Sequence, residues 1–598
     1  MTDSVACASA VLGQLLAQGV TDLVLAPGSR SAPLALVADA AARAGRLRLH
    51  VRVDERSAGF LALGIAKASG RCVPIVTTSG TAVGNLLPAV MEAHHSGVPL
   101  LVVSADRPAA LVGFGANQTT EQAHLFDGFL RYRARVSSSA SVVSWPAQAA
   151  RAVLAATGAL SRFPGPAQLN VELGEPLVAG AVEAPPEVQP VLTPEQPDAV
   201  AHPLPGTPRT LVVCGDAPVE VGRVAVELAE AGDLPLVAEP SSNARTGANA
   251  MVNGRILLNG PLGEQVERVI VFGRPNLSRP VTALLSRADV EVVVLSASPD
   301  FVDPGWRASL ITGAVSIEPG DPAWLAAWQQ ADSQVRSLNS ERRVLQGDPG
   351  LRRDDATGRD DFRGRDGGVG RDDGAGRDDL SPGTSPNVVP GTSPDVIRAL
   401  AGISDHIERN LTAGFLTGPQ VAALVVASVP GDQVLCLGNS NPIRDADLAP
   451  VRPDAPPVFA NRGLSGIDGT LATAIGVALG SGRPTTLLCG DLSFVHDVGA
   501  LAIGPGEPRP ELRIVVADDA GGSIFATLEY GGAQFADSFE RVFATPTGLD
   551  LVALIRGFGI PCVRISTADE LASALAESVT GLEVLVVDVD RSGRRPLA

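Results

Sequence analysis

Acidic residues follow two apolar stretches late in the chain, and each stands beside glycine. The first stretch, residues 486–489, runs into Gly490-Asp491; the second, residues 514–517, runs into Asp518-Asp519 with glycine shortly after. Both stretches are typical of buried strands, and open α/β sheets bind ligands at the carboxyl ends of their strands. Mg²⁺ prefers one or two carboxylates together with the phosphate oxygens of a ligand. The pattern therefore predicts a site for a metal ion and a diphosphate at one sheet edge.

The spacing of these acidic residues resembles the diphosphate-binding motif of thiamine diphosphate enzymes. Gly-Asp is followed, 28 positions after Asp491, by Asp519 and then by Gly521. The resemblance implies that both Asp side chains and the carbonyl of Gly521 bind the metal, with Asp518 only a neighbour. Ala520 departs from the Asn or Asp that the family usually has there, and its side chain is no ligand. Acidic caps on two strand-end turns are the alternative, which the paired strands and the spacing disfavour.

Thiamine chemistry also requires a carboxyl group against the aminopyrimidine ring, and an apolar site favours its neutral form. Residues 47–53 alternate like a strand and end in Asp54-Glu55, directly before an apolar helical stretch. Glu55 lies where thiamine diphosphate enzymes place their catalytic glutamate. Helix N-terminal charge is the competing interpretation, and it suits Asp54 better as a cap.

Strand and helix signals alternate through three long parts of the chain, which must position these residues. This alternation predicts an α/β fold of three doubly wound parallel-sheet domains, of the thiamine diphosphate-binding enzyme type. We place the pyrimidine-binding domain with the catalytic glutamate at residues 1–183, a Rossmann-like middle domain at 209–335 and the diphosphate- and metal-binding domain at 396–598. Residues 184–208 are predicted to be a linker. Residues 336–395 begin as a polar stretch and become rich in Gly, Arg, Asp and Pro; we predict a disordered linker there, because so little apolar surface can be buried.

Bulk properties exclude several classes of protein. The 598 residues are too many for one core, and a net charge of −18 argues against nucleic acid as a partner. Residues 1–20 lack the basic cluster of a signal peptide, and no apolar run approaches the length that crosses a bilayer. The six cysteines contain no C-x-x-C pair, which disfavours a disulfide framework or a zinc site. We expect a cytoplasmic protein without membrane insertion.

Further short motifs narrow the family. They occupy residues 27–34, 54–60, 78–82, 105–108, 115–118, 438–444, 461–469 and 490–497. Together they resemble the 2-succinyl-5-enolpyruvyl-6-hydroxy-3-cyclohexene-1-carboxylate (SEPHCHC) synthase family, also called MenD, over nearly the whole chain except residues 347–395. That family uses thiamine diphosphate and Mg²⁺ or Mn²⁺ to decarboxylate 2-oxoglutarate. It adds the succinyl carbanion equivalent to isochorismate in menaquinone biosynthesis, and the resemblance implies the same reaction here.

Both substrates carry several carboxylates, which arginine recognises with a planar, bidentate guanidinium group. By resemblance, the substrate-binding residues are Ser29, Arg30, Arg107, Asn117, Ser440, Arg444, Arg462, Ile524 and Phe525, with Arg279 as a further candidate from the middle domain. Gln118 would contact the reacting intermediate and act with Glu55. The implied cofactor-binding residues are Glu55, Asn439, Ile467, Gly490, Asp491, Ser493, Phe494, Asp519 and Gly521. Among these, Ile467 would prop the cofactor in its bent form.

The resemblance also bears on assembly. In the family the glutamate domain of one subunit faces the metal domain of another, so we expect a homodimer or a dimer of dimers with shared active sites. The middle domain lacks a G-x-G-x-x-G loop after its first strand, which disfavours FAD or NAD there.

Two alternatives stay open. The first is another 2-oxo acid decarboxylase or carboligase, such as one that makes acetolactate, and consumption of pyruvate without isochorismate would favour it. The second is a non-catalytic diphosphate-binding regulatory protein, which would bind the cofactor in a Glu55→Gln variant with no reaction to lose.

Overall fold

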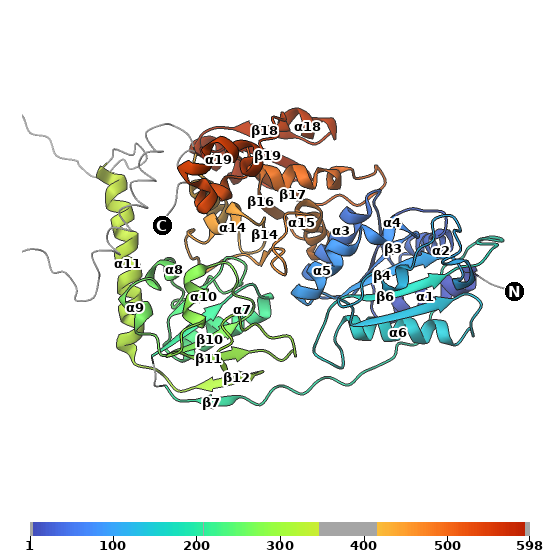
Figure 1. Ribbon diagram of the computed structural model, residues 1–598, viewed down its shortest axis with the longest axis horizontal. Coiled ribbons are helices and arrows are strands. Elements are labelled where there is room, and N and C mark those ends of the chain that lie inside the picture. Colours follow the sequence, from blue (N-terminus) through green and yellow to red (C-terminus); the bar gives the residue numbers. More distant parts are fainter. Residues whose placement is uncertain (1–3, 207–208, 346–415, 592–598) are drawn as a thin grey trace, which may run out of the picture.

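Three large parallel sheets with helices on their faces, and one small sheet of two strands, make up the described part of the chain (Figure 1). The computed structural model describes residues 4–206, 209–345 and 416–591. Every pairing between the named strands of these ranges is parallel. The predicted α/β class of doubly wound parallel sheets is thus confirmed, while the disorder predicted for residues 347–395 lies outside the described residues.

The N-terminal sheet has six strands in the order β2-β1-β3-β4-β6-β5. Its strands are β1 (Asp22–Leu25), β2 (Arg48–Val51), β3 (Val73–Thr77), β4 (Leu100–Asp106), β5 (Tyr132–Ser137) and β6 (Ala167–Glu172). Its helices are α1 (Ser4–Ala17), α2 (Ala32–Arg43), α3 (Glu55–Ser69), α4 (Thr81–Gly84), α5 (Leu87–Ser96) and α6 (Ser144–Ala156), with 3₁₀ turns η1 (Ala109–Leu111) and η2 (Gln122–His124). The central strands β3 and β4 are buried throughout, as expected for a sheet covered on both faces.

The middle sheet has five strands in the order β12-β11-β10-β8-β9. Its strands are β8 (Thr210–Cys214), β9 (Leu236–Ala238), β10 (Arg268–Phe272), β11 (Glu291–Leu295) and β12 (Ala308–Thr312), and its helices are α7 (Val219–Ala231), α8 (Gly254–Leu257), α9 (Pro261–Glu264), α10 (Arg279–Leu285) and α11 (Pro322–Leu345). The segment predicted as a linker contains a strand, β7 (His202–Leu204), which pairs with β13 (Val315–Ile317). Three residues are too few to show the alternation of a strand, so this pairing could not be predicted from the sequence.

The C-terminal sheet has six strands in the order β15-β14-β16-β17-β19-β18. Its strands are β14 (Val434–Leu437), β15 (Val458–Phe459), β16 (Thr485–Gly490), β17 (Leu512–Asp518), β18 (Cys562–Ile565) and β19 (Leu582–Asp588). Its helices are α13 (Gly418–Ser428), α14 (Asn441–Ala446), α15 (Thr470–Ser481), α16 (Asp491–His496), α17 (Ala536–Phe539), α18 (Leu551–Gly557) and α19 (Ala568–Ala576). Short turns η3 (Val498–Leu501), η4 (Ser523–Thr527), η5 (Glu529–Gly531), η6 (Ala533–Phe535) and η7 (Glu540–Ala544) complete the domain.

Helices α3 and α15 join the N-terminal and C-terminal domains, and Figure 1 shows them side by side between the two sheets. One apolar core runs from the N-terminal sheet through both helices into the C-terminal sheet. Glycines allow the helices to approach closely. A Cβ on Gly64 would lie 2.2 Å from the carbonyl oxygen of Thr473, and one on Gly476 would lie 2.3 Å from that of Leu61. The two domains therefore share one rigid junction, close to both predicted halves of the site.

Two further observations bear on the sequence predictions. Within the described ranges, no helix combines the length and apolar character needed to cross a membrane. The six cysteines are free thiols, five of them buried, so they serve as small core residues.

Candidate active site

The two carboxylates predicted as metal ligands lie together at the carboxyl edge of the C-terminal sheet. Asp491 opens α16 directly after β16, and Asp519 follows β17, the neighbouring strand. They are only 6% and 8% exposed. Burial and the Asp519 carboxylate raise the pKa of Asp491 to about 7, against the opposing effect of the backbone N–H groups of Leu492 and Gly521. Two buried carboxylates that repel each other favour a cation between them.

The turn after β17 has the shape that the predicted carbonyl ligand needs. Ala520 and Gly521 both have positive φ, 56° and 135°. A Cβ on Gly521 would lie 2.4 Å from the carbonyl oxygen of Ala544, so only glycine fits here. The Gly521 carbonyl accepts a hydrogen bond from the Ser523 N–H at 3.0 Å, and its second lone pair stays available for a metal ion.

Neighbouring side chains separate the roles of Asp518 and Asp519. Asp518 forms an ion pair with Arg564 at 3.4 Å, and Arg564 also pairs with Asp588. Asp519 instead accepts a hydrogen bond from the Ser523 hydroxyl, which in turn accepts one from Asn441 Nδ2 at 2.6 Å. This geometry supports Asp519 as the ligand. Sequence reasoning gave no role to Ser523 or Asn441, although both lie within or next to motifs that it singled out.

The donor set as a whole fits a divalent cation beside a diphosphate. Across the described part of the chain, no three His, Cys, Asp or Glu side chains gather where they could hold a metal ion. A set of two carboxylates and one carbonyl, completed by ligand oxygens, is the kind that Mg²⁺ accepts. Next to Asp491, a Cβ on Gly490 would meet nothing within 4 Å, which leaves space for a ligand.

Other residues predicted to bind the cofactor hold the loops of this edge. Asn439 Nδ2 donates to the carbonyl oxygens of Asn461 and Gly466, both at 2.7 Å, so its side-chain amide is already engaged by the protein. Ile467 is half-buried, and its carbonyl accepts the Thr470 hydroxyl at 2.8 Å. Two members of α16 are buried: Ser493 at 3% and Phe494 at 0% exposure, the latter within the apolar core. The Phe494 side chain therefore anchors α16 in the core. Only the backbone of Phe494 could contact a ligand.

Arginines from the middle and C-terminal domains form one cationic group near this edge. Burial and the charges of Arg462, Arg255 and Arg279 lower the pKa of Arg444, which places these guanidinium groups close together. Arg444 Nη1 donates to the carbonyl of Ser440 at 2.8 Å, and Ser440 has φ 74°. Because α14 also carries Asn441, which reaches the Asp519 loop through Ser523, this group lies beside the predicted metal site.

Arg462 is the most deeply placed member of this group, at 2% exposure. Its Nη1 donates to Asn439 Oδ1 at 2.8 Å, and its Nη2 donates to Asn276 Oδ1 of the middle domain at 2.5 Å. Its Nε is buried without a hydrogen-bond partner among the described residues. Arg30 has an orphan Nε of the same kind. Buried donors without partners are costly, and a bound carboxylate would satisfy them.

Glu55, Gln118, Arg30 and Arg107 lie on the N-terminal domain. Glu55 is the first residue of α3, half-buried, and accepts a hydrogen bond from Asn85 Nδ2 at 3.3 Å. Gln118 is exposed with φ 57°, and its Nε2 donates to the carbonyl of Ser79 at 2.8 Å. Arg107 Nη1 donates to Ser79 Oγ at 2.7 Å and to the carbonyl of Gln118 at 3.1 Å. Burial and the charge of Arg30 lower the pKa of Arg107, so the two cations are neighbours.

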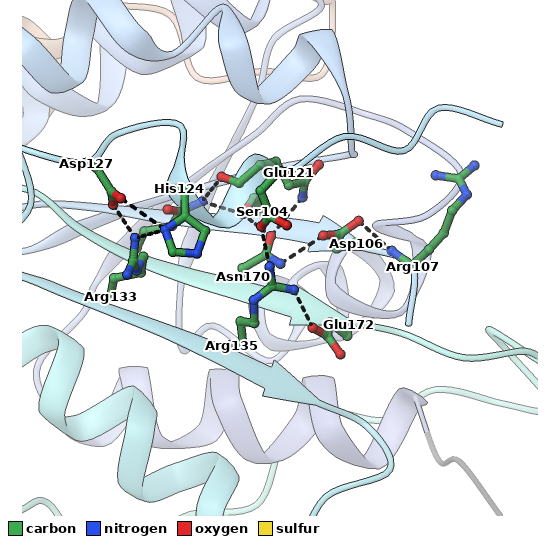
Figure 2. Close-up of polar contacts among 12 residues, drawn as sticks. Ser104, Asp106, Arg107, Glu121, His124, Asp127, Arg133, Arg135, Asn170 and Glu172 are labelled. Atoms are coloured by element: carbon green, nitrogen blue, oxygen red, sulfur yellow. Dashed lines mark hydrogen bonds and ion pairs between the residues drawn. The ribbon is translucent and has the colours of Figure 1, made fainter. Parts of the chain in front are cut away.

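A buried polar network supports the Gln118 loop, and Figure 2 shows three of its members, Asp106, Arg107 and Asn170, on or next to β4 and β6. Gln122 accepts from the Gly80 N–H at 3.0 Å and donates to Asn170 Oδ1 at 2.8 Å. Asn170 Nδ2 donates to Asp106 Oδ2 at 2.9 Å, and Asp106 Oδ1 accepts from the Arg107 N–H at 2.8 Å. The network thus ties Arg107 and the turn at Gly80 to rigid strands.

The remaining predicted residues lie at the rims of these groups. Ser29 and Asn117 are exposed, and Ile524 and Phe525 are half-buried in η4 after the Asp519 turn. The Phe525 ring lies 5.8 Å from that of Phe543. The chain therefore gathers the predicted site residues into two groups: one on the N-terminal domain around Glu55 and Gln118, and one on the C-terminal and middle domains around Asp491 and Arg444.

Comparison with known domain families gives the class of the protein. Residues 6–127 match the thiamine pyrophosphate enzyme N-terminal TPP binding domain, and residues 447–589 match the C-terminal TPP binding domain. The first range carries the group around Glu55 and Gln118, and the second carries Arg462, Ile467 and the predicted residues from Gly490 to Phe525. Four predicted residues lie outside both ranges: Arg279, Asn439, Ser440 and Arg444. Fold and matches together define a thiamine pyrophosphate enzyme.

Whole-chain relatives narrow this class. The chain is 44% identical to the 2-succinyl-5-enolpyruvyl-6-hydroxy-3-cyclohexene-1-carboxylate synthase of Kineococcus radiotolerans, covering 100% of this chain and 98% of the relative. It is 41% identical to the synthase of that name from Nocardioides sp. (99% and 96% covered) and 38% identical to that from Rhodococcus erythropolis (100% and 98%). The chain belongs to the SEPHCHC synthase family, which confirms the resemblance seen in its sequence.

Proposed function

We propose that this chain is a thiamine diphosphate-dependent transferase that decarboxylates 2-oxoglutarate and joins the remaining succinyl unit to isochorismate. The products are SEPHCHC and CO₂, formed in the cytoplasm as a step of menaquinone biosynthesis. The observation that carries this proposal is the similarity over the whole chain to proteins named SEPHCHC synthase, together with the two matched TPP binding domains. Arg279, Arg444 and Arg462 support it, because Asn441 of α14 links the Arg444 helix to the Asp519 loop through Ser523. A cationic group next to a metal–diphosphate site suits substrates that bear several carboxylates.

Different residues of the chain would bind different parts of the cofactor. Asp491, Asp519 and the Gly521 carbonyl would hold Mg²⁺ or Mn²⁺, which would neutralise charge on the diphosphate. Ile467 would support the rings from the C-terminal domain. When bound, thiamine diphosphate would supply a cationic thiazolium ring that takes up the electron pair left by decarboxylation. Glu55 would hydrogen-bond the pyrimidine ring and hold the proton that sets its tautomer.

The substrate carboxylates would be bound by arginines from both groups. Arg444 and Arg462 contribute from one side, and Arg30 and Arg107 from the other, with orphan Nε donors on Arg30 and Arg462. Gln118 stands beside Arg107 through their shared contacts with Ser79. In a site that excludes water, such preorganised donors orient the two substrates for the joining step.

A homodimer, or a dimer of dimers, would complete the site, because the two groups of residues lie on different domains. Exposed apolar side chains flank the N-terminal group: Val53 is 80% exposed two positions before Glu55, and Phe114 is 84% exposed four positions before Gln118. A second copy that covers these side chains would bury apolar surface and bring its own Asp491 group to Glu55.

The reaction is tested by supplying 2-oxoglutarate and isochorismate, with and without thiamine diphosphate and Mg²⁺, and measuring CO₂ and the joined product. We expect CO₂ release that needs the cofactor and a product that needs both substrates. Consumption of pyruvate without isochorismate would overturn the proposal in favour of another carboligase. Glu55→Gln serves as the matched control, since it keeps the side-chain shape and removes the acid.

Shared active sites are tested by mixing two inactive variants, Glu55→Gln and Asp519→Ala, after dissociation and reassociation. If each site uses Glu55 of one chain and Asp519 of the other, every mixed dimer has one intact site. Random reassociation then restores about one quarter of wild-type activity, because about half of the dimers are mixed. If each chain builds its own site, the mixture stays inactive.

A further inference from the structure

Glu92 is a buried carboxylate of the N-terminal domain to which the proposed reaction gives no role. It lies on α5 and is 4% exposed. Both of its oxygens face a loop of the C-terminal domain: Oε1 accepts from the Gly463 N–H and Oε2 from the Leu464 N–H, each at 2.9 Å. A carboxylate that accepts two successive backbone N–H groups is held by strong, charge-assisted hydrogen bonds. These two residues directly follow Arg462.

The loop is shaped to receive this carboxylate. A Cβ on Gly463 would lie 3.0 Å from Glu92 Oε2 and 2.7 Å from the hydroxyl of Ser96, so the backbone approaches α5 too closely for another residue. Ser96 Oγ also donates to Glu92 Oε1 at 2.7 Å. The fit explains why glycine follows the arginine in this chain.

Lys67 holds the other side of the same loop. It lies near the end of α3, the helix that begins at Glu55. Its Nζ donates to the carbonyl of Ala460 at 2.6 Å and to Asn461 Oδ1 at 3.4 Å, and it lies 3.6 Å from Glu92 Oε1. Lys67 therefore holds the backbone before Arg462, and Glu92 holds the backbone after it. The two buried charges also lie close enough to form an ion pair.

The Arg462 side chain points the opposite way, to Asn439 and to Asn276 of the middle domain. Asn276 Nδ2 also donates to the Arg462 carbonyl at 2.9 Å, so the middle domain contacts both the backbone and the guanidinium group of Arg462. Glu92 and Lys67 of the N-terminal domain hold the residues on either side of it. We propose that Glu92, together with Lys67, is a positioning residue that sets the place of Arg462 and thereby the affinity for the anionic substrate. This inference rests on the proposed function and deepens it, because it adds residues outside the site to substrate binding.

The test uses Glu92→Gln in the full-length protein. A glutamine offers one oxygen, so its NH₂ group must face one of the two loop N–H groups and a hydrogen bond is lost. The matched control is Glu583→Gln, which breaks the 2.7 Å ion pair with Arg513 in the first residues of β17 and β19, at the sheet edge opposite the site. Circular dichroism shows whether both variants keep the fold.

Two readouts decide the question. Hydrogen exchange of a peptide spanning residues 460–467 is expected to accelerate in Glu92→Gln and to stay unchanged in Glu583→Gln. In kinetics, Glu92→Gln is expected to raise KM for an anionic substrate about tenfold with little change in kcat, the factor for one lost hydrogen bond to a charged group. In an Arg462→Ala background, Glu92→Gln is expected to add almost nothing, because both changes act through one contact.

Unchanged exchange in Glu92→Gln, or effects that simply multiply with those of Arg462→Ala, would overturn the inference. Gly463→Ala provides a second route if Glu92→Gln does not fold, since it displaces the loop while keeping the carboxylate, and the same KM increase is expected. If the wild-type chain turns over neither substrate, the proposed function fails, and the exchange experiment still decides whether Glu92 holds the loop.

Discussion

The buried pair of Asp491 and Asp519 makes the metal-free protein lose stability as the pH rises. Burial and the Asp519 carboxylate raise the pKa of Asp491 to about 7, whereas an aspartate of the unfolded chain keeps a pKa of about 3.9. Because the folded pKa is the higher one, the stabilisation by the bound proton is complete below about pH 4 and is lost as the pH rises through about 7. At about 1.4 kcal/mol for each factor of ten, the loss reaches about 4 kcal/mol at pH 8.

Asp491→Asn removes this titration while it keeps the shape of the side chain. In EDTA, we expect the variant to be more stable than the wild-type chain by about 1 to 2 kcal/mol at pH 5 and about 4 kcal/mol at pH 8. Urea unfolding at both pH values measures the difference. A chain with three sheets is not expected to unfold in one step, so the free energies are compared within the transition of the C-terminal domain.

Saturating Mg²⁺ and thiamine diphosphate are expected to reverse the order, because only the wild-type site keeps both carboxylate ligands and ligand binding stabilises the folded state. Asp518→Asn is the control: it removes only a smaller part of the repulsion on Asp491 and it loses the ion pair with Arg564, so a much smaller gain in EDTA is expected. The difference in unfolding free energy between Asp491→Asn and the wild-type chain should grow from pH 5 to pH 8. A difference that does not grow would refute the placement of Asp491 against a second buried carboxylate.

Three further predictions concern the proposed reaction. Glu55→Gln is expected to lower turnover by about 10² to 10⁴ with an unchanged circular dichroism spectrum, the range for loss of an acid–base group; near-wild-type turnover would remove Glu55 from its role. Asp519→Ala is expected to weaken Mn²⁺ binding, followed by electron paramagnetic resonance, by about tenfold or more, while Asp518→Ala leaves it nearly unchanged. Arg444→Ala is expected to raise KM for an anionic substrate about 10- to 100-fold through loss of a charge-assisted hydrogen bond; equal steady-state constants in variant and wild type would exclude that contact.

The fold and the two strand-end carboxylates could be predicted because their signals are local. Apolar runs of strand length that end in Gly-Asp or Asp-Asp place side chains at a sheet edge without knowledge of the rest of the chain. At the start of α3, the sequence allowed either a helix cap or a catalytic carboxyl group. Asp54 is the cap, since it accepts the Ser57 N–H at 3.0 Å. The cap therefore does not use Glu55, whose catalytic role stays a prediction.

Polar contacts between residues far apart in the chain, within a domain or between domains, could not be predicted from one sequence. Asn441 and Ser523 are 82 positions apart, Asn276 and Arg462 are 186 apart, and Glu92 and Gly463 are 371 apart. Each is a single polar pair, and a single Asn or Glu carries no period that would reveal its partner. Strand β7 was missed for a related reason. It has only three residues, and it is a strand because it pairs with β13, which lies more than 100 positions later.

These cross-domain contacts give α3 two tasks. At its start, Arg56 Nη2 donates to the carbonyl of His496 at 2.8 Å, the last residue of the helix that Asp491 opens. At its other end, Lys67 grips the loop that carries Arg462. In a dimer with shared sites, Glu55 of this helix would serve the cofactor of the partner, while Arg56 and Lys67 brace the metal helix and the substrate arginine of their own chain. If the proposed dimer forms, a shift of α3 would alter both active sites together, because the same helix carries Glu55, Arg56 and Lys67.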